Sequence, residues 1–283
     1  MRAPIVISRL DGGEPGRRPF DLPHTLIAPY RDGAFTAAVI AGAPINCDVV
    51  TCAPHGAGTH TETARHVIDA PLWISDVAPL RLLRCALITM PARQLGATDE
   101  RGPRTGQPDD RVLTAADLHA ALRALPATGT RGDTRDHPEA LVIRWSGLDA
   151  PDDWRPLLDQ PPYLTRECMH AVRAAGVDHL VVELPSVDRW ADDGQLENHR
   201  TFWALPPRPP THPAQPPRAS LLPDGWLDSP AAARTITELA WVPRDVADGW
   251  WALRVDVPPW RTDAAPARLS LHDPGAWSDT RCG

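Results

Sequence analysis

The stretch PHGAGTHTETARH, residues 54–66, brings together three imidazoles and a carboxylate, those of His55, His60, Glu62 and His66. The whole chain has 11 histidines in 283 residues, so this density is unusual. Imidazole nitrogen together with carboxylate oxygen suits Zn²⁺, Mn²⁺ or Fe²⁺. The stretch therefore favours a metal or catalytic site over a polar loop whose histidines bond only to the backbone.

The elements around this stretch must bring its side chains to one centre. An apolar run at Asn46–Cys52 predicts a strand just before it. In extended chain His60 and Glu62 lie on the same side, because alternate residues do. Two glycines at positions 56 and 58 allow a tight turn, so His55 can swing toward that centre. His66 lies six residues beyond His60 and is expected at the edge of the site without being a ligand.

Composition limits the function class. The formal net charge is −7 and no basic patch has interleaved aromatics, so no nucleic-acid partner is expected. All 29 basic residues are Arg, which excludes chemistry that needs a lysine. No apolar run is long enough for a membrane span, and the apolar segment at the start of the chain is too short for a secretory signal, so neither is expected. The five scattered cysteines have no CxxC, so a cytoplasmic location is expected.

Strand and helix patterns alternate along the chain and predict an α/β fold. Helices are predicted at Thr114–Leu125, which opens with a cap-like Thr, and at Thr165–Ala175, which stops at a glycine. We expect one domain over residues 1–283, with long loops at about 95–113 and 205–218. Strands are predicted at Ile5–Ile7, Ala37–Ile40, Asn46–Cys52, Leu83–Met90, Leu141–Trp145, His179–Leu184, Thr235–Val242 and Trp251–Val257.

Four blocks in order resemble one known family. GTHTE followed by ARH resembles the H-x-G-T-H-x-D-x-P-x-H signature of the kynurenine formamidase, or "cyclase", family of metal-dependent hydrolases, which includes isatin hydrolase. The further blocks are HLVVELPSVDRW (179–190), ENHRTFW (197–203) and the segment from TITEL to APAR (235–268). The resemblance covers the chain from about residue 45 to residue 272. It implies a single domain of the swivelling β/β/α type.

The resemblance implies a divalent metal, Zn or Mn, as one or two ions. It also implies His66 as the acid–base residue beside the metal. Two departures stand out: the family's first His falls at Gly56, one residue after His55, and its Asp is replaced by Glu62. The implied ligands are His55, His60, Glu62, His199 and Glu238.

These residues predict hydrolysis of an amide, formamide or lactam C–N bond in a small molecule, with His66 moving the proton. No G-x-S-x-G elbow is present, which argues against a serine nucleophile. A cyclase or dehydratase with the same site, and a metal-dependent binder without turnover, are the alternatives. The substrate-binding residues are unknown from the sequence, and a homo-oligomer is expected. Ser186 and Asp188, after a predicted strand, are interpreted as turn-forming residues.

Overall fold

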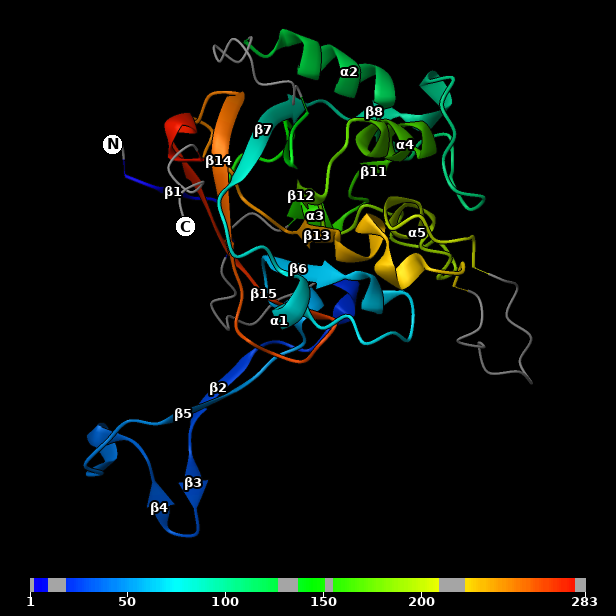
Figure 1. Cartoon of the computed structure of the whole chain (residues 1–283). Coiled ribbons are helices and arrows are strands. Elements are labelled where there is room, and N and C mark those ends of the chain that lie inside the picture. The colour runs from blue at the N-terminus through cyan, green and yellow to red at the C-terminus, as the bar shows by residue number, and fades with distance from the viewer. Residues whose placement is uncertain (1–2, 10–18, 127–136, 151–154, 209–221, 278–283) are drawn as a thin grey trace, which may run out of the picture.

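The strand that carries His60 and Glu62 belongs to one mixed sheet, together with most of the other strands. The computed structural model describes residues 3–9, 19–126, 137–150, 155–208 and 222–277 (Figure 1). In these residues nine strands pair in one sheet, with β7, β10, β12 and β13 parallel and their outer neighbours antiparallel. Their spatial order is β1 (Ile5–Val6), β16 (Arg268–His272), β14 (Gly249–Asp256), β7 (Leu83–Met90), β10 (Ala140–Trp145), β12 (His179–Val182), β13 (Thr235–Glu238), β6 (His60–Thr63) and β15 (Ala264–Pro266).

The central strands are buried on both faces, so their sequences read as continuous apolar runs rather than alternating ones. On β7, Ala86 and Ile88 face one core, which also holds Leu118 and Met169 from helices. The alternate residues of that strand face a second core with the apolar side chains of β14 and β16. The sheet is therefore covered by helices on one side and curls onto its own outer strands on the other. This arrangement confirms the predicted α/β class.

Two predicted helices form with the predicted caps. Thr114 accepts the Asp117 backbone N–H at 3.1 Å and begins α2 (Ala115–Ala124). Thr165 accepts the Cys168 backbone N–H at 3.1 Å and begins α4 (Arg166–Ala174). Both satisfy N–H groups that a helix start leaves unpaired. The remaining α-helices of the described residues are short: α1 (Ile74–Val77), α3 (Arg155–Leu158) and α5 (Glu197–Phe202). None is long and apolar enough to cross a lipid bilayer.

A hairpin arm projects from the body of the molecule (Figure 1). The predicted strand at Asn46–Cys52 is found as β5 (Asp48–Thr51), but it pairs only with β2 (Leu26–Pro29), outside the main sheet. The strand predicted at Ala37–Ile40 is wrong, because Val39–Ala41 forms the 3-10 helix η2 and ends at Gly42 with a φ of 89°. The arm also contains the small β-ladder of β3 (Arg31–Asp32) and β4 (Phe35–Thr36).

The two segments predicted as loops contain little regular structure. Within 95–113 the structure has a 3-10 turn, η5 (Leu95–Ala97), and the strand β9 (Arg111–Leu113). β9 pairs with β8 (Arg93–Gln94) and β11 (Tyr163–Leu164) in a small separate sheet. In the second segment, 205–208 has no helix or strand, and 209–218 lies outside the described residues.

Candidate metal centre

Strand β6 lies in the sheet with the His60 and Glu62 side chains on one face. It pairs antiparallel with β13, and the register sets Glu238 directly opposite His60. Side chains opposite each other in such a pair share a face, so all three meet. His60 Nε2 lies 3.6 Å from Glu238 Oε2. All three are almost fully buried.

The GTH turn fixes the first of these residues. Gly58 has a φ of 92°, a conformation that other residues rarely adopt, and its carbonyl accepts a hydrogen bond from His60 Nδ1 at 3.1 Å. Thr59 Oγ1 donates to the Leu239 carbonyl at 2.6 Å. That bond ties the turn to the residue after Glu238. The glycine and threonine of the motif therefore orient a ring and lock two strands together.

The structure brings His55 into the cluster despite its shifted position in the motif. It lies in the 3-10 turn η3 (Pro54–Gly56), and its Nδ1 is 3.3 Å from Glu62 Oε2. A Cβ at Gly56 would lie 2.7 Å from the Cβ of Leu22, so no side chain fits there without a shift. The imidazole of His55 therefore lies beside Glu62, although its position in the motif is shifted by one residue.

His199 approaches Glu62 from another element, α5. Its Nε2 is 2.9 Å from Glu62 Oε1 and 3.5 Å from Glu238 Oε1. Its other nitrogen, Nδ1, donates to Asp188 Oδ2 at 2.6 Å. Asp188 also accepts the backbone N–H groups of Asn198 and His199, at 2.8 and 3.1 Å. The turn-forming interpretation of Asp188 is therefore incomplete: a carboxylate holds the ring and aims Nε2 at the cluster.

His66 lies at the edge of the cluster, in the 3-10 turn η4 (Ala64–His66) that follows β6. Its Nδ1 is 3.4 Å from Asp263 Oδ2 and 3.9 Å from Glu62 Oε2. The same Asp263 oxygen lies 2.9 Å from His55 Nε2. One carboxylate oxygen therefore contacts both partly exposed histidines, whose rings lie 4.3 Å apart.

Burial and charge oppose each other in this cluster. Burial tends to lower the pKa of His55, but hydrogen bonds to the Asp263 and Glu62 carboxylates raise it to about 10. Burial lowers the pKa of His60 to about 3. Burial disfavours the ionised form of Glu62, yet the charges of His66 and His199 hold its pKa well below the usual value. Burial raises the pKa of Glu238. Imidazolium charge therefore favours the carboxylate form of Glu62, whereas burial disfavours the charged forms of His60 and Glu238.

The donor atoms of the cluster fit a divalent metal. His60 Nε2, His199 Nε2 and both Glu62 oxygens are buried and have no hydrogen bond of acceptable geometry among the described residues. Leaving such a group unsatisfied costs about 1–3 kcal/mol. Two groups of candidate ligand atoms lie within 4.8 Å of one another: His55, Glu62 and His66 form one, and His60, Glu62 and Glu238 the other. Mixed imidazole and carboxylate ligands without thiolate suit zinc or manganese.

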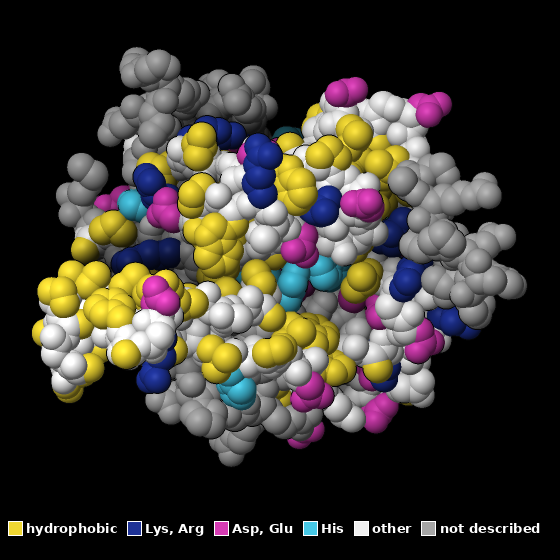
Figure 2. Space-filling model, turned by 90° about the horizontal axis from the view of Figure 1, so that it is seen from below, with side chains coloured by type: hydrophobic (Ala, Val, Ile, Leu, Met, Phe, Trp, Pro, Cys, Tyr) yellow, Lys and Arg dark blue, Asp and Glu magenta, His cyan; other side chains and the backbone are white. Residues whose placement is uncertain are grey.

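The cluster is accessible from one side. His60, Glu62, His199 and Glu238 are at most 3% exposed, whereas the side chains of His55 and His66 are 21% and 27% exposed. Figure 2 shows histidine side chains at the floor of a hollow near the centre of that face. A small molecule can therefore meet His55, His66 and Asp263 before it meets the buried ligands.

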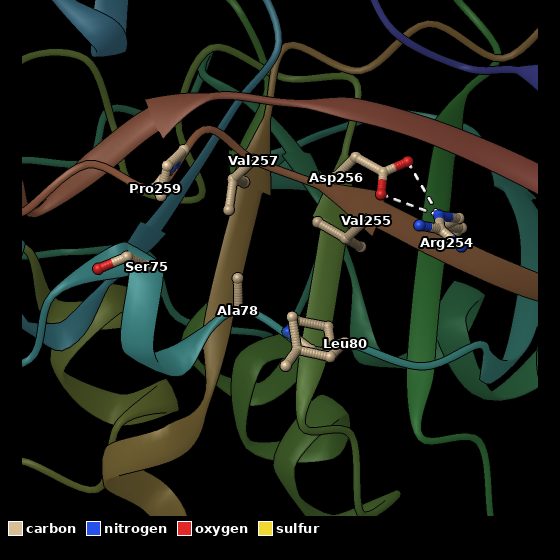
Figure 3. Close-up of a pocket in the computed structure, with 9 residues that line it drawn as sticks. Ser75, Ala78, Leu80, Arg254, Val255, Asp256, Val257 and Pro259 are labelled. Atoms are coloured by element: carbon tan, nitrogen blue, oxygen red, sulfur yellow. Dashed lines mark hydrogen bonds and ion pairs between the residues drawn. The ribbon is translucent and has the colours of Figure 1, made fainter. Parts of the chain in front are cut away.

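Two hollows elsewhere on the body do not include cluster residues. The one drawn in Figure 3 has a volume of about 180 Å³ and lies between Ala78 and Leu80 on one side and Val255 and Val257 on the other. Ligand pockets usually have about 300–1,000 Å³, so this hollow is too small for a typical small-molecule site. The second, of about 510 Å³, lies at the base of the arm and is lined by Val50, Trp260 and Pro266, among others.

The sequence interpretation missed Asp263 and underrated Asp188. Both lie in blocks that carry the family resemblance, but neither has a local motif that reports its partner. Asp188 precedes His199 by 11 residues, and Asp263 follows His55 by 208. Only the folded chain reveals these contacts. The five proposed ligands and His66 do lie together, with Glu62 at their centre.

Comparison with solved structures shows the fold. Isatin hydrolase A from Labrenzia aggregata is 12% identical, with a TM-score of 0.56 over 95% of this chain and 93% of that one. Isatin hydrolase A from Ralstonia solanacearum is 13% identical, with a TM-score of 0.56 over 95% and 92%. A predicted metal-dependent hydrolase from Bacillus stearothermophilus is 14% identical, with a TM-score of 0.50 over 95% and 97%. A search of curated proteins finds no match.

Comparison with family models identifies the family. The model described as "Putative cyclase" matches residues 20–189, which is more than half of the chain. The matched part contains the GTHTE motif, His55, His66 and Asp188. The chain therefore belongs to the cyclase family.

Proposed function

We propose that this protein is a metal-dependent hydrolase that opens an amide, formamide or lactam C–N bond in a small molecule. One observation carries the proposal. On the accessible side of the buried cluster of imidazole and carboxylate groups lies a histidine, His66, that contacts the carboxylate of Asp263. A pure binder needs the ligands but has no use for a partly exposed His66 held by Asp263. Proton transfer needs both.

The metal would be held by His60, Glu62 and Glu238, with His199 completing the set. His55 Nδ1 lies 3.3 Å from Glu62 Oε2, so His55 would be a further ligand, with His66 beside the metal rather than bound to it. Zinc or manganese fits such ligands. When bound, the metal supplies Lewis-acid chemistry: it lowers the pKa of water and polarises a carbonyl oxygen.

The protein's own groups would then move the proton and hold the ligand ring in place. Asp263 accepts from His66 Nδ1, which leaves Nε2 of that ring as the proton acceptor. We assign this Nε2 to take a proton from the attacking water and to deliver it to the leaving nitrogen. Asp188 keeps the His199 ring fixed during both steps. Ring closure with loss of water would use the same groups in reverse.

A substrate screen with matched metal states tests this proposal. Protein stripped by a chelator and protein reloaded with Zn²⁺ or Mn²⁺ would be assayed with N-formyl aryl amines, lactams and isatin, and with the corresponding ring-opened acids. We expect ring opening or deformylation in the reloaded protein and none in the stripped protein. Equal turnover in both states would contradict the proposal, and turnover of the acids alone would assign ring closure instead.

The proposed cellular location is the cytoplasm. Cys47, Cys52, Cys85 and Cys168 are free thiols in the structure, and a reducing compartment keeps thiols in that state.

A further inference from the structure

A buried arginine joins the two elements that carry His199 and His66. Arg200 follows His199 in α5 and is 7% exposed. Its Nη1 donates to the Val67 carbonyl at 3.2 Å, across 133 positions of the chain. Val67 directly follows His66 and ends the turn η4. One side chain therefore spans the space between the helix of a proposed metal ligand and the turn of the proposed acid–base residue.

The same side chain is itself held by the segment that leaves α5. Arg200 Nε donates to the Pro206 carbonyl at 2.6 Å, and the Arg200 backbone carbonyl accepts the Leu205 N–H at 2.8 Å. Ala204, just before them, has a φ of 54°, a conformation that residues other than glycine rarely adopt. Such a conformation persists where the surrounding contacts hold it. Arg200 is therefore anchored at the end of α5 before it reaches the turn of His66.

The shape of a guanidinium suits this link. Nε and Nη1 of Arg200 donate to carbonyls of two separate segments, one at Pro206 and one at Val67. A lysine has a single terminal nitrogen and cannot reproduce this planar fork. The positive charge strengthens both hydrogen bonds. The position therefore requires the arginine itself and not only a positive charge.

The ring of His66 depends on where its turn lies, because its own contacts are long. His66 Nδ1 is 3.4 Å from Asp263 Oδ2 and 3.9 Å from Glu62 Oε2, and the side chain is 27% exposed. Its ring centre lies 5.5 Å from that of His199. A shift of about 1 Å in a reacting group can cost about 100-fold in rate. The turn η4 must therefore be held firmly against α5.

We propose that Arg200 is a positioning residue, which holds η4 against α5 and so keeps the His66 ring at its working distance from the metal ligands. This inference rests on the proposed function, because it concerns the group that would carry the proton. Asp188 holds the His199 ring from the other side, so Arg200 is not needed to aim that ligand. Loss of Arg200 should therefore affect His66 and leave metal affinity unchanged.

Two variants and a matched control test the proposal. Arg200→Lys removes the fork and keeps the charge, whereas Arg200→Met removes both. Arg234→Lys is the control, because Arg234 Nη1 also donates to a carbonyl of α5, that of Phe202, at 2.9 Å. Within the described part of the chain the other side-chain hydrogen bond of Arg234 goes to Asp178 and not to η4. Thermal unfolding checks that each variant is folded, and Arg200→Lys carries the test if Arg200→Met is not.

Hydrogen exchange in metal-free protein measures how firmly η4 is held. The Val67 and Ile68 amides both donate to the Ala64 carbonyl, at 3.0 and 3.2 Å. Their exchange should be roughly tenfold faster in both Arg200 variants, which lose a hydrogen bond from a charged group, and unchanged in Arg234→Lys. In protein reloaded with Zn²⁺, kcat should fall roughly 10–100-fold in the Arg200 variants, while KM and zinc affinity stay within about twofold.

Exchange at Val67 and Ile68 that is as slow in both Arg200 variants as in the wild-type protein would overturn the proposal. So would an unchanged kcat, or an equal loss of kcat in Arg234→Lys. Loss of zinc affinity in step with kcat would also overturn it, because Arg200 would then act through His199. A wild-type protein that turns over none of the screened compounds would refute the proposed function instead. The exchange measurement needs neither metal nor substrate, so it would still decide whether Arg200 holds the turn of His66.

Discussion

Asp188 holds the His199 ring from the side opposite the cluster, through a 2.6 Å contact between Oδ2 and Nδ1. In an Asp188→Asn variant the side chain keeps one acceptor oxygen, and its N–H₂ group takes the place of either Oδ2 or Oδ1. It cannot accept from Nδ1–H and still accept both backbone N–H groups. The ring should then tilt or change tautomer, and Nε2 loses its aim at Glu62.

Loss of such an orienting carboxylate usually lowers metal affinity by about 10–100-fold, or about 1.4–2.7 kcal/mol. Asp192→Asn is a close control. Asp192 is also buried before α5 and also accepts two backbone N–H groups, from Gly194 at 2.8 Å and Leu196 at 2.6 Å. Its hydrogen bonds within the described part of the chain go to Gly194, Gln195 and Leu196 and not to the cluster, so its replacement should leave metal affinity within about twofold.

The assay is competition for Zn²⁺ between each folded variant and a chromophoric chelator at fixed pH. Thermal unfolding of the stripped proteins measures the stability change separately from metal affinity. If Asp188→Asn and Asp192→Asn bind zinc equally well, the carboxylate does not orient a ligand. The reasoning that assigns Asp188 to aim the His199 ring would then be refuted.

Three further outcomes are expected. His66→Ala should keep its metal and lose roughly 10²–10⁴-fold in turnover, measured with metal content on the same sample; loss of metal in step with activity would make His66 a ligand. His55→Ala should bind metal about tens-fold more weakly by the same competition assay, and an unchanged affinity would remove His55 from the site. Burial lowers the pKa of His179 from 6.5 to about 4, so its stabilising effect is complete above pH 6.5 and is lost as the pH falls toward 4. Relative to His179→Gln, the wild-type free energy of unfolding should therefore fall by up to about 3 kcal/mol between pH 7 and 4, and parallel pH profiles would refute this.

The sequence predicted elements whose signals are local. The eight residues of β7 appear at their predicted bounds because a buried strand reads as an apolar run. Helices α2 and α4 begin after Thr114 and Thr165 because a side-chain oxygen at that position satisfies a free N–H. His60 and Glu62 were placed on one face by the two-residue period of an extended chain, and β6 has that conformation.

Features that depend on distant partners could not be predicted. The pattern at Asn46–Cys52 predicts a strand but does not indicate that the strand leaves the sheet and joins an arm. Val39 and Ile40 are β-branched and read as a strand, whereas the turn ending at Gly42 decides their conformation. Asp263 contacts His55 across 208 positions, and no local spacing reports such a contact.

Metal content is the measurement that tests the central claim most directly. Protein purified without chelator would be analysed for Zn, Mn and Fe beside Glu62→Gln, since Glu62 belongs to both groups of ligand atoms. The structure predicts at least one equivalent of a divalent metal in the wild-type protein and a large loss in the variant, with both proteins folded. Folded wild-type protein that carries no metal, and takes up neither Zn²⁺ nor Mn²⁺ when they are added, would contradict it.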